Sequence, residues 1–486
     1  MNKLDLIRAY LAGELRARRL QSGGRLPGCR QLAASLGVNK LTVNKAYRVF
    51  ESEQLVYSVP RGGFYIVDTE GWEDAAGESA AGAGPSPEAG ARAGVGAGAW
   101  DSAAAAASRA PLDCRSLVPE ARLVPFKEFT HVMNRAVEQF RSRLFGYEQA
   151  AGFPGLLETL QADLARDDIY AHPTQLVVTN GAQQALWLVL QVLFSGAARK
   201  LLVEAPTYSL LLEAADQLRI PVVGIARGPD GLDFRLLSQL FRSGEYAAFY
   251  VIPRHHNPTG YSLTEGAKKR LAALAADSSV VLIEDDYLAG LGSGKGELPL
   301  HYHDRSKATI HIRSFSKTFM PGIRTGLAIV PEALVEPVLH LKRLHDLNTS
   351  SLPQAALGLF IGSGLYRRHL ARISQAYDRK LALAREIFAA LAPEGLHWHI
   401  PQHGLFVWLE LPPGLSAVAA EKALEAGGIL VKAADAFFPA RTVPEPLAFR
   451  HRGLRVCLCG IPAERLPELA RLLRLLGGMI AGQGQS

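Results

Sequence analysis

The stretch from Thr69 to Ala110 consists almost entirely of Ala, Gly, Ser and Pro. It carries few charges, and its two large aromatic residues, Trp72 and Trp100, stand alone. Such a composition cannot bury enough apolar surface to offset the entropy that a chain loses when it becomes ordered. We therefore expect residues 69–110 to be a flexible linker between two separately folded parts, residues 1–68 and 111–486.

The composition excludes several classes of protein. The 486 residues are 48% hydrophobic and 20% charged, which is ordinary for a globular protein. No run of 18 apolar residues occurs, so a membrane span is not expected. The N-terminus has no apolar core before a cleavage site, which argues against secretion. The four cysteines form no Cys-x-x-Cys pair, so we expect no metal site and a cytoplasmic protein with reduced thiols.

The positive charge of the chain is confined to its start. Residues 1–67 contain eleven Lys and Arg against four Asp and Glu, whereas the following 419 residues contain 42 of each sign. The whole net charge of +7 therefore lies in the first part. A small basic module is typical of nucleic-acid binding, although a solvated basic face would give the same count.

The same segment has the element order of a helix-turn-helix domain. Apolar residues at helical spacing predict helices over 4–20, 30–36 and 40–52, with Gly37 ending the second helix and Asn39 capping the third. A short turn between two helices, the second beginning with polar and basic residues, is the geometry that reads a DNA groove. The buried face of the third helix should consist of Val43, Ala46, Tyr47 and Phe50.

A β-hairpin is predicted after these helices, with strands over 55–59 and 64–67 and an arginine at its tip. The hairpin would reach a phosphate or the minor groove. The expected DNA-contacting residues are Arg30, Lys40, Thr42, Asn44, Lys45, Arg61 and Gly62.

Residues 10–67 resemble the GntR-type winged helix. The resemblance lies in Leu26-Pro27-Gly28-Cys29-Arg30-Gln31-Leu32-Ala33, in Leu36-Gly37-Val38-Asn39-Lys40-Leu41-Thr42-Val43, and in Ala46-Tyr47. Gly28 stands where that family usually has a serine. The resemblance implies binding to double-stranded DNA.

From residue 111 onward, apolar β-branched runs alternate with helical stretches. This pattern predicts an α/β fold with a mostly parallel sheet that is covered on both faces. In such sheets a ligand lies beyond the carboxyl ends of the strands, where polar clusters occur in this sequence. The expected strands are 176–179, 201–204, 247–252, 280–283, 309–313 and 326–330, the last of which can run antiparallel.

Lys317 follows one of these strands and has the surroundings of a Schiff-base lysine for a phosphorylated aldehyde. A lysine amine attacks carbonyl groups, and hydroxyls and a guanidinium nearby can bind a phosphate. An aspartate after a buried strand can keep a pyridine nitrogen protonated, and we favour Asp285 over Asp286 for this role. The expected phosphate ligands are Gly181, Ala182, Gln183, Ser314, Ser316 and Arg324, and Tyr208 is expected to stack on the ring.

Residues 112–478 together resemble fold-type I pyridoxal-phosphate enzymes, the aspartate aminotransferase superfamily. The resemblance implies pyridoxal 5'-phosphate held as an aldimine on Lys317 and hydrogen-bonded through its phenolic oxygen to Asn257 and Tyr287. It further implies that Arg455, in Gly453-Leu454-Arg455-Val456, binds a carboxylate. A smaller C-terminal α+β subdomain is expected from about residue 340 to 486.

A GntR-type winged helix, a linker and an aminotransferase-like part in one chain resemble the MocR family of bacterial transcription regulators. The resemblance implies a homodimer, often head-to-tail, and a pyridoxal-phosphate domain that senses an amine, an amino acid or the cofactor itself. A working aminotransferase with a fused DNA-binding module is the alternative, because Lys317, Asp285, Asn257 and Arg455 retain the groups for transamination. The sequence leaves enzymatic turnover open.

Overall fold

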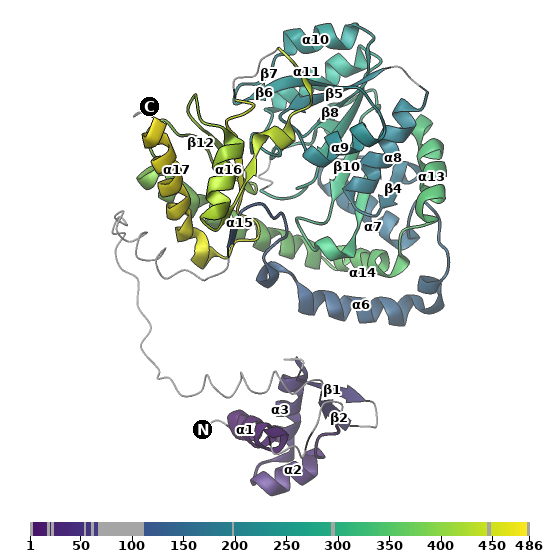
Figure 1. Cartoon of the computed structure of the whole chain (residues 1–486). Coiled ribbons are helices and arrows are strands. Elements are labelled where there is room, and N and C mark those ends of the chain that lie inside the picture. Colours follow the sequence, from purple (N-terminus) through teal and green to yellow (C-terminus); the bar gives the residue numbers. More distant parts are fainter. Residues whose placement is uncertain are drawn as a thin grey trace. The chain divides into compact units, whose positions relative to one another are not determined.

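The chain forms two compact units, Met1–Ala93 and Gly94–Ser486 (Figure 1). The predicted linker and the hairpin tip with Arg61 and Gly62 lie outside the described residues, so the expected domain boundaries at residues 68 and 110 stay predictions. This computed structural model describes residues 3–16, 20, 24–52, 55–59, 63–66, 111–196, 199–292, 297–444 and 449–483.

The first unit has the element order of a winged helix. The predicted caps are confirmed, because Gly37 ends α2 in the left-handed conformation and Asn39 Oδ1 accepts a hydrogen bond from the Leu41 amide at 2.9 Å. The Tyr47 hydroxyl donates to the Pro27 carbonyl at 2.8 Å and so fixes α3 to the residues before α2. The elements are α1 (Lys3–Arg16), α2 (Cys29–Leu36), α3 (Lys40–Ser52), β1 (Val56–Val59) and β2 (Gly63–Ile66).

The second unit is built around a nine-stranded sheet. Strands β16, β6, β5, β8, β9 and β10 pair in parallel in that order, β11 pairs antiparallel with β10 and β4, and β7 pairs with β6. The α/β fold with a mostly parallel sheet is thus confirmed, including the antiparallel strand at 326–330. The strands are β4 (Leu176–Thr179), β5 (Lys200–Ala205), β6 (Val222–Gly228), β7 (Gly231–Leu232), β8 (Tyr246–Val251), β9 (Val281–Asp286), β10 (Ile310–Ser314), β11 (Gly326–Ile329) and β16 (Arg441–Val443).

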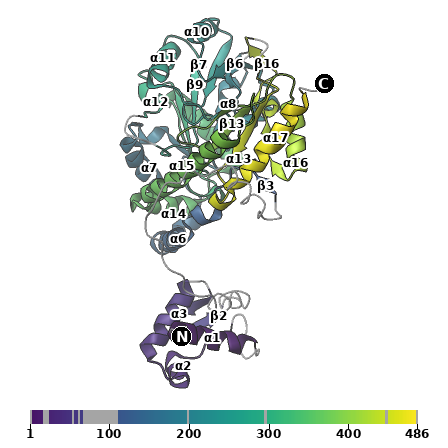
Figure 2. The same ribbon diagram turned by 90° about the vertical axis from the view of Figure 1, so that its left-hand side faces the viewer.

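Helices cover both faces of this sheet (Figures 1 and 2). Helices α8, α9 and α13 pack on one face, and α6, α7, α10, α11 and α14 pack on the other. Alternate strand residues therefore enter different cores, as the two-residue period of a strand requires. These helices are α6 (Phe126–Phe140), α7 (Pro154–Arg166), α8 (Ala182–Phe194), α9 (Ser209–Gln217), α10 (Phe234–Arg242), α11 (Glu265–Ala276), α13 (Glu332–Asp346) and α14 (Ser351–Gly362).

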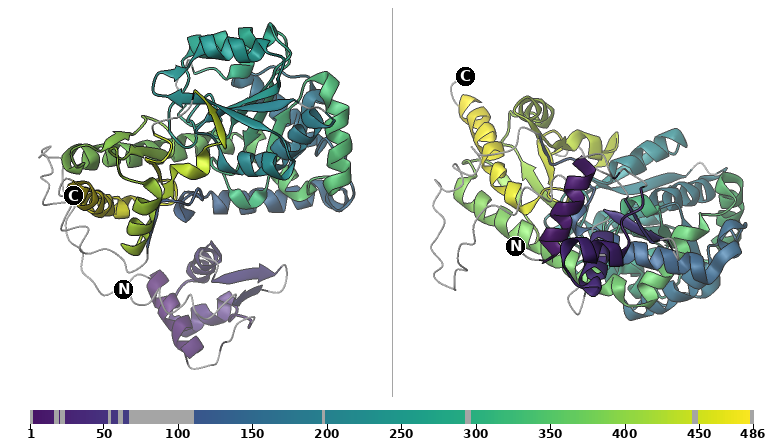
Figure 3. Two further views of the ribbon diagram at one scale, coloured as in Figure 1. Left: turned by 45° about the horizontal axis from the view of Figure 1, so that its top comes forward. Right: turned by 90° about the horizontal axis from the view of Figure 1, so that it is seen from below.

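A smaller α+β part follows, as predicted (Figure 3). It has a sheet in the order β12-β13-β17-β15 and its own core. Its expected boundary near residue 340 stays a prediction. Helix α14 lies beyond that residue but packs with α6 and α7, and β16 returns to the large sheet. The elements are α15 (Leu365–Leu391), β12 (His397–His399), β13 (Phe406–Glu410), α16 (Ala417–Ala426), β14 (Ile429–Leu430), β15 (Lys432–Ala433), β17 (Gly453–Cys457) and α17 (Leu469–Gln483), together with β3 (Leu112–Asp113), which pairs with β14.

Short helices complete the second unit. Among the residues that the structure describes, no helix is long and apolar enough to cross a membrane. The short helices are α12 (Leu300–His303) and the 3-10 turns η2 (Ala121–Leu123), η3 (Arg141–Phe145), η4 (Pro173–Gln175), η5 (Pro321–Ile323), η6 (Ala434–Phe437) and η7 (Ala463–Glu468).

A close backbone contact joins β11 to the start of α8. A Cβ atom at Gly326 would lie 2.6 Å from the carbonyl carbon of Gly181 and 2.7 Å from the amide nitrogen of Ala182. Neither backbone atom can move without displacing the helix. Glycine at position 326 is therefore required for α8 to begin where it does.

Replacing Gly326 by Ala should lower the free energy of unfolding by about 1–3 kcal/mol, because an added methyl group in a filled space displaces its neighbours. Urea denaturation of the purified protein would measure the loss. Gly322→Ala is the matched control, since a Cβ there meets no atom within 4 Å. Equal stability of the two variants would contradict this interpretation of the contact.

Candidate functional site

The first unit presents polar and basic side chains on α2 and on the first half of α3. Arg30, Lys40, Asn44 and Lys45 are exposed, and Thr42 is half-buried. The opposite side of the helix enters the core, where the four predicted residues are all buried. The surface can therefore contact a ligand without disturbing the fold. The four buried residues are Val43, Ala46, Tyr47 and Phe50.

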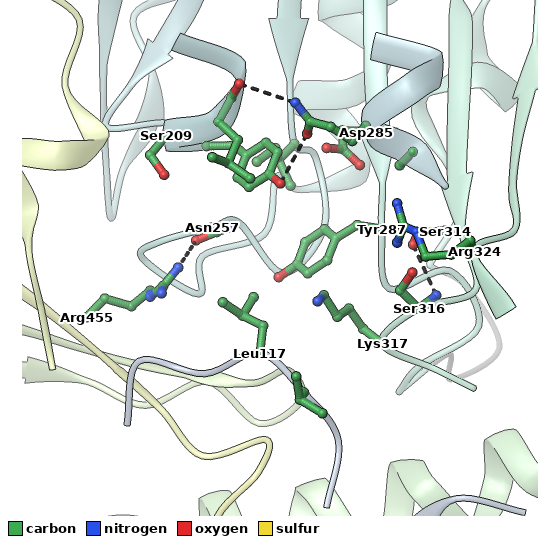
Figure 4. A pocket seen from close by; sticks show the side chains of 16 residues that line it. Leu117, Ser209, Asn257, Asp285, Tyr287, Ser314, Ser316, Lys317, Arg324 and Arg455 are labelled. Atoms are coloured by element: carbon green, nitrogen blue, oxygen red, sulfur yellow. Dashed lines mark hydrogen bonds between the residues drawn. The ribbon is translucent and has the colours of Figure 1, made fainter. Parts of the chain in front are cut away.

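The second unit contains a cavity of about 380 Å³ at the carboxyl ends of β8, β9 and β10 (Figure 4). Parallel pairing brings these strand ends to one edge of the sheet. Gly181 stands at the N-cap of α8 beside the cavity. The predicted residues that line the cavity are Ala182, Gln183, Tyr208, Asn257, Asp285, Tyr287, Ser314, Ser316, Lys317, Arg324 and Arg455.

Lys317 is half-buried three residues after the end of β10, and its amine is turned into the cavity (Figure 4). Burial lowers the pKa of this amine, because the charged form loses its hydration. The guanidinium groups of Arg324 and Arg455 lower the pKa further, while nearby thiols partly oppose the effect. A lowered pKa increases the fraction of the neutral, nucleophilic amine.

Asp285 and Asp286 have opposite surroundings. Asp285 lines the cavity, its Oδ2 accepts a hydrogen bond from the Tyr250 hydroxyl at 2.6 Å, and its buried Oδ1 has no partner among the described residues. Burial raises the pKa of Asp285 to about 7. Asp286 pairs with Arg254, whose Nε donates to Oδ1 at 3.2 Å. Asp286 is buried at the end of β9 and does not line the cavity.

The groups at one end of the cavity suit a phosphate. Helix α8 begins there, and its first amides carry the positive end of the helix dipole. The exposed Arg324 donates from Nη2 to the Asn180 carbonyl at 2.9 Å, which holds the guanidinium beside that helix end. Ser314 and Ser316 add hydroxyls, and the Ser316 amide donates to Ser314 Oγ at 3.2 Å. Together they provide donors of the kind that bind dianions.

Tyr208, Asn257 and Tyr287 lie around the middle of the cavity. The Tyr208 hydroxyl donates to Gln183 Oε1 at 3.3 Å, so its ring is fixed at the cavity wall. The Tyr287 hydroxyl donates to the His255 carbonyl at 2.7 Å and is turned toward the amine of Lys317 (Figure 4). Asn257 Oδ1 accepts from Arg455, which leaves the amide NH₂ group of Asn257 as its donor.

Arg455 lies opposite the phosphate-type end and is 5% exposed. It is therefore not a surface arginine. Its Nη1 donates to Asn257 Oδ1 at 3.1 Å and its Nη2 to the Arg115 carbonyl at 3.1 Å. The guanidinium lies 5.0 Å from the ring centroid of Phe406 and 4.9 Å from that of Phe437. This rigid cation has its Nε without a partner among the described residues and can bind an anionic group.

Several lining residues were not predicted. Most are apolar or small, and nothing in their local sequence distinguishes them from core or loop residues. The unpredicted residues that line the cavity are Leu117, Val118, Ser209, Leu210 and Ile252.

Two buried thiols, Cys457 and Cys459, also lie near Lys317, and the Tyr377 hydroxyl is 3.4 Å from Cys459 Sγ.

In the described part of the chain, no group of three or more His, Cys, Asp or Glu side chains could hold a metal ion.

Two family models match the chain. Residues 5–66 match the gntR family of bacterial regulatory proteins, and residues 124–473 match aminotransferase class I and II. The first match includes the polar surface of α3, and the second includes every predicted residue of the cavity.

Relatives with both parts match nearly the whole chain. The HTH-type transcriptional regulator YcxD of Bacillus subtilis (strain 168) is 33% identical over 93% of this chain and 95% of its own length. The HTH-type transcriptional regulator YdcR of Escherichia coli (strain K12) is 28% identical over 86% of this chain and 88% of its own.

Solved structures similar to the second unit include aminotransferases. The α-aminoadipate aminotransferase LysN of Thermus thermophilus, complexed with N-(5'-phosphopyridoxyl)-L-leucine, has a TM-score of 0.69 and 26% identity, covering 77% of this chain and 94% of its own. The kynurenine aminotransferase of Pyrococcus horikoshii, at a TM-score of 0.70 and 22% identity, covers 77% of this chain and 92% of its own. With its helix-turn-helix unit, its aminotransferase fold and its matching regulators, this chain belongs to the MocR-type family, in which a GntR-type DNA-binding domain precedes a class I and II aminotransferase domain.

Proposed function

We propose that this chain is a transcription regulator that binds DNA through its first unit and pyridoxal 5'-phosphate in the cavity around Lys317. The ligand that it senses would be an amine, an amino acid or the cofactor itself. One observation carries the proposal, namely the combination of groups that line a single cavity. These groups are the Lys317 amine with its lowered pKa, the unpartnered buried Oδ1 of Asp285, and donors that suit a phosphate. The chain that contains this cavity begins with a GntR-type domain.

The donor set of the cavity fits pyridoxal phosphate group by group. Ser314, Ser316, Arg324 and the first amides of α8 would hold the phosphate. Asp285 would hold the ring nitrogen, because its free Oδ1 needs a partner in a buried place. When bound, the cofactor supplies an aldehyde that amines attack and a ring that withdraws electrons.

The side chains of this cavity would control protons and position. Burial lowers the pKa of the Lys317 amine, which raises the fraction of neutral amine that can react with a carbonyl group. A protonated ring nitrogen beside Asp285 would stabilise the charged carboxylate and so lower its pKa. Tyr208 would pack on the ring, and the amide NH₂ group of Asn257 would donate to the ring's phenolic oxygen.

Arg455 supports an effector that carries a carboxylate. Its guanidinium is held by Asn257 and the Arg115 carbonyl and by two aromatic rings. An orientation fixed before binding favours bidentate binding of a carboxylate. An α-amino acid would then present its amine toward Lys317 while its carboxylate meets Arg455.

A second candidate function is an active aminotransferase with a fused DNA-binding module. The specific observation in its favour is that Lys317, Asp285, Asn257 and Arg455 all line the same cavity. These are the groups that proton transfer and substrate binding in transamination require. Turnover would be compatible with regulation, since the same binding step precedes both.

We further propose a homodimer, with a head-to-tail exchange of the DNA-binding units. Large apolar side chains are exposed on α6 and after it, including Phe126, Phe145 and Tyr147, at 56%, 77% and 85%. Exposed apolar groups in this number support a protein interface.

We also propose the domain boundaries that the sequence predicts. Residues 1–68 would be the DNA-binding domain, residues 69–110 the linker and residues 111–486 the aminotransferase-like domain.

Replacing Lys317 by Ala should abolish the visible absorbance that the purified protein gains when pyridoxal phosphate is added, because no other amine would hold the cofactor in this cavity. Absorption spectroscopy during titration with the cofactor would measure the effect. Lys127→Ala, at an exposed position on α6, is the control and should retain the absorbance. A Lys317→Ala protein with an unchanged spectrum would refute the cofactor proposal.

Asp285 should make the stability of the cofactor-free protein fall with pH. Its pKa of about 7 exceeds the ordinary 3.8, so the folded state binds the proton more tightly and the resulting stability is lost as pH rises through about 7. Asp285→Asn keeps an acceptor for the Tyr250 hydroxyl but does not titrate. Relative to wild type, this variant should gain about 2–3 kcal/mol of unfolding free energy between pH 5 and pH 8.

Urea denaturation at the two pH values would measure this gain. Asp277→Asn, at an exposed carboxylate, is the control and should follow the wild type at both values. A constant difference between Asp285→Asn and wild type would show that Asp285 is charged across the whole range.

Replacing Lys40 and Lys45 together by Ala should weaken binding to any DNA duplex, because both ammonium groups are exposed on α3 and can meet phosphates. The slope of log K against log[salt] should fall by about 2 in magnitude, since each lost phosphate contact removes about 0.9. Fluorescence anisotropy at several salt concentrations would measure it. The double variant Lys127→Ala/Lys269→Ala, in the second unit, should keep the wild-type slope; an unchanged slope in the α3 variant would place the phosphate contacts elsewhere.

A further inference from the structure

A second cavity, of about 410 Å³, lies where the two parts of the second unit meet. Its walls come from the large sheet and the turn after β8 on one side, and from strands β12 and β13 on the other. It shares no lining residue with the cavity around Lys317. The lining residues that matter below are Arg227, Tyr261, Trp398, His399, Trp408 and Glu410.

The walls of the second cavity are aromatic and flat. The ring of Tyr261 stacks on that of His399 with centroids 4.0 Å apart and an interplanar angle of 27°. Trp398 is 37% exposed, so part of its indole is available to a ligand. Burial lowers the pKa of His399, which makes it a neutral ring near pH 7. These rings offer surfaces that attract other flat groups and cations.

The charge of the second cavity is negative. Glu410 is half-buried, and its Oε1 accepts a hydrogen bond from Trp408 Nε1 at 3.1 Å. Within the described ranges, no salt bridge joins Glu410 to a cation. Arg227 also lines the cavity, but its fully buried guanidinium is paired with Glu204 and so is neutralised.

The negative charge of Glu410 influences the aromatic wall of the second cavity. Burial raises the pKa of Tyr261 to about 12, and the carboxylates of Glu410 and Asp230 contribute to the rise. The Nε2 atom of His399 is buried and has no partner among the residues that the structure describes. The cavity thus combines one unpaired carboxylate, aromatic faces and an unsatisfied ring nitrogen.

We propose that the second cavity binds a small, flat organic cation, such as an aromatic amidinium or a protonated heteroaromatic amine. The cation would pair with Glu410 and lie against the rings of Tyr261 and Trp398. A cavity of this size and with aromatic walls suits a small molecule. Because its lining comes from both parts of the second unit, its occupant would contact both.

Three probes of one shape and different charge test the proposal on the full-length protein: benzamidine, benzamide and benzoate. Isothermal titration calorimetry should give at least about tenfold tighter binding for the cation benzamidine than for neutral benzamide, whereas any binding of benzoate, which Arg455 can accept in the first cavity, should be unchanged by Glu410→Gln. None of the three has an aliphatic primary amine, so none of them would react with an aldehyde bound in the cavity around Lys317. Equal affinities for the three probes would overturn the proposal.

Variants locate the bound probe. Glu410→Gln keeps an acceptor for Trp408 Nε1 but removes the charge, so benzamidine should bind it no better than benzamide. Glu332→Gln, at an exposed carboxylate on α13, is the matched control and should keep the wild-type preference. If Glu410→Gln does not fold, Trp398→Ala takes its place as the test. This position is partly exposed, and the substitution should weaken the binding of benzamidine several-fold.

Asp285→Asn separates this cavity from the one around Lys317, whose carboxylate could also attract a cation. The proposed site predicts that this variant keeps the wild-type affinity for benzamidine. Loss of binding in Asp285→Asn together with full binding in Glu410→Gln would place the probe at Lys317 and refute the second site. Neither result depends on whether the protein binds pyridoxal phosphate.

Discussion

The parallel pairing of β8, β9 and β10 is the constraint on which the cavity around Lys317 depends. Residues at equal distances along these strands lie side by side, so that Ile312 pairs with Asp285 and the strand ends open at one edge. Two residues further along β10, Ser314 ends the strand, and the chain then turns to place Lys317 beside Asp285. A shift of β10 by one residue would exchange the faces of all these side chains.

Much of this arrangement could be predicted from the sequence because it is local. Each polar cluster directly follows an apolar run, and the place of a residue after a strand decides which edge it reaches. Lys317, Asp285 and Asn257 are each identified by neighbours within a few positions. The same holds for the first unit, where Gly37 and Asn39 mark the ends of two helices.

The parts that could not be predicted depend on contacts between distant segments. Leu117 and Val118 line the first cavity, yet no pattern around them indicates a ligand. The burial of Arg455 depends on rings at positions 406 and 437. In the second cavity, Tyr261 meets His399 across more than 130 residues of sequence, a proximity that only the packing of the two parts creates.

Strand β3 pairs with β14, so the start of the described second unit is attached to its smaller part and not to the large sheet. The amide of Cys457 also donates to the Cys114 carbonyl, which ties the same segment to the strand that carries Arg455. The covalent path from the DNA-binding unit therefore enters through the smaller part. Under the function proposed above, a carboxylate that binds Arg455 would therefore touch a guanidinium that is itself hydrogen-bonded to the Arg115 carbonyl, in the first described segment of the second unit.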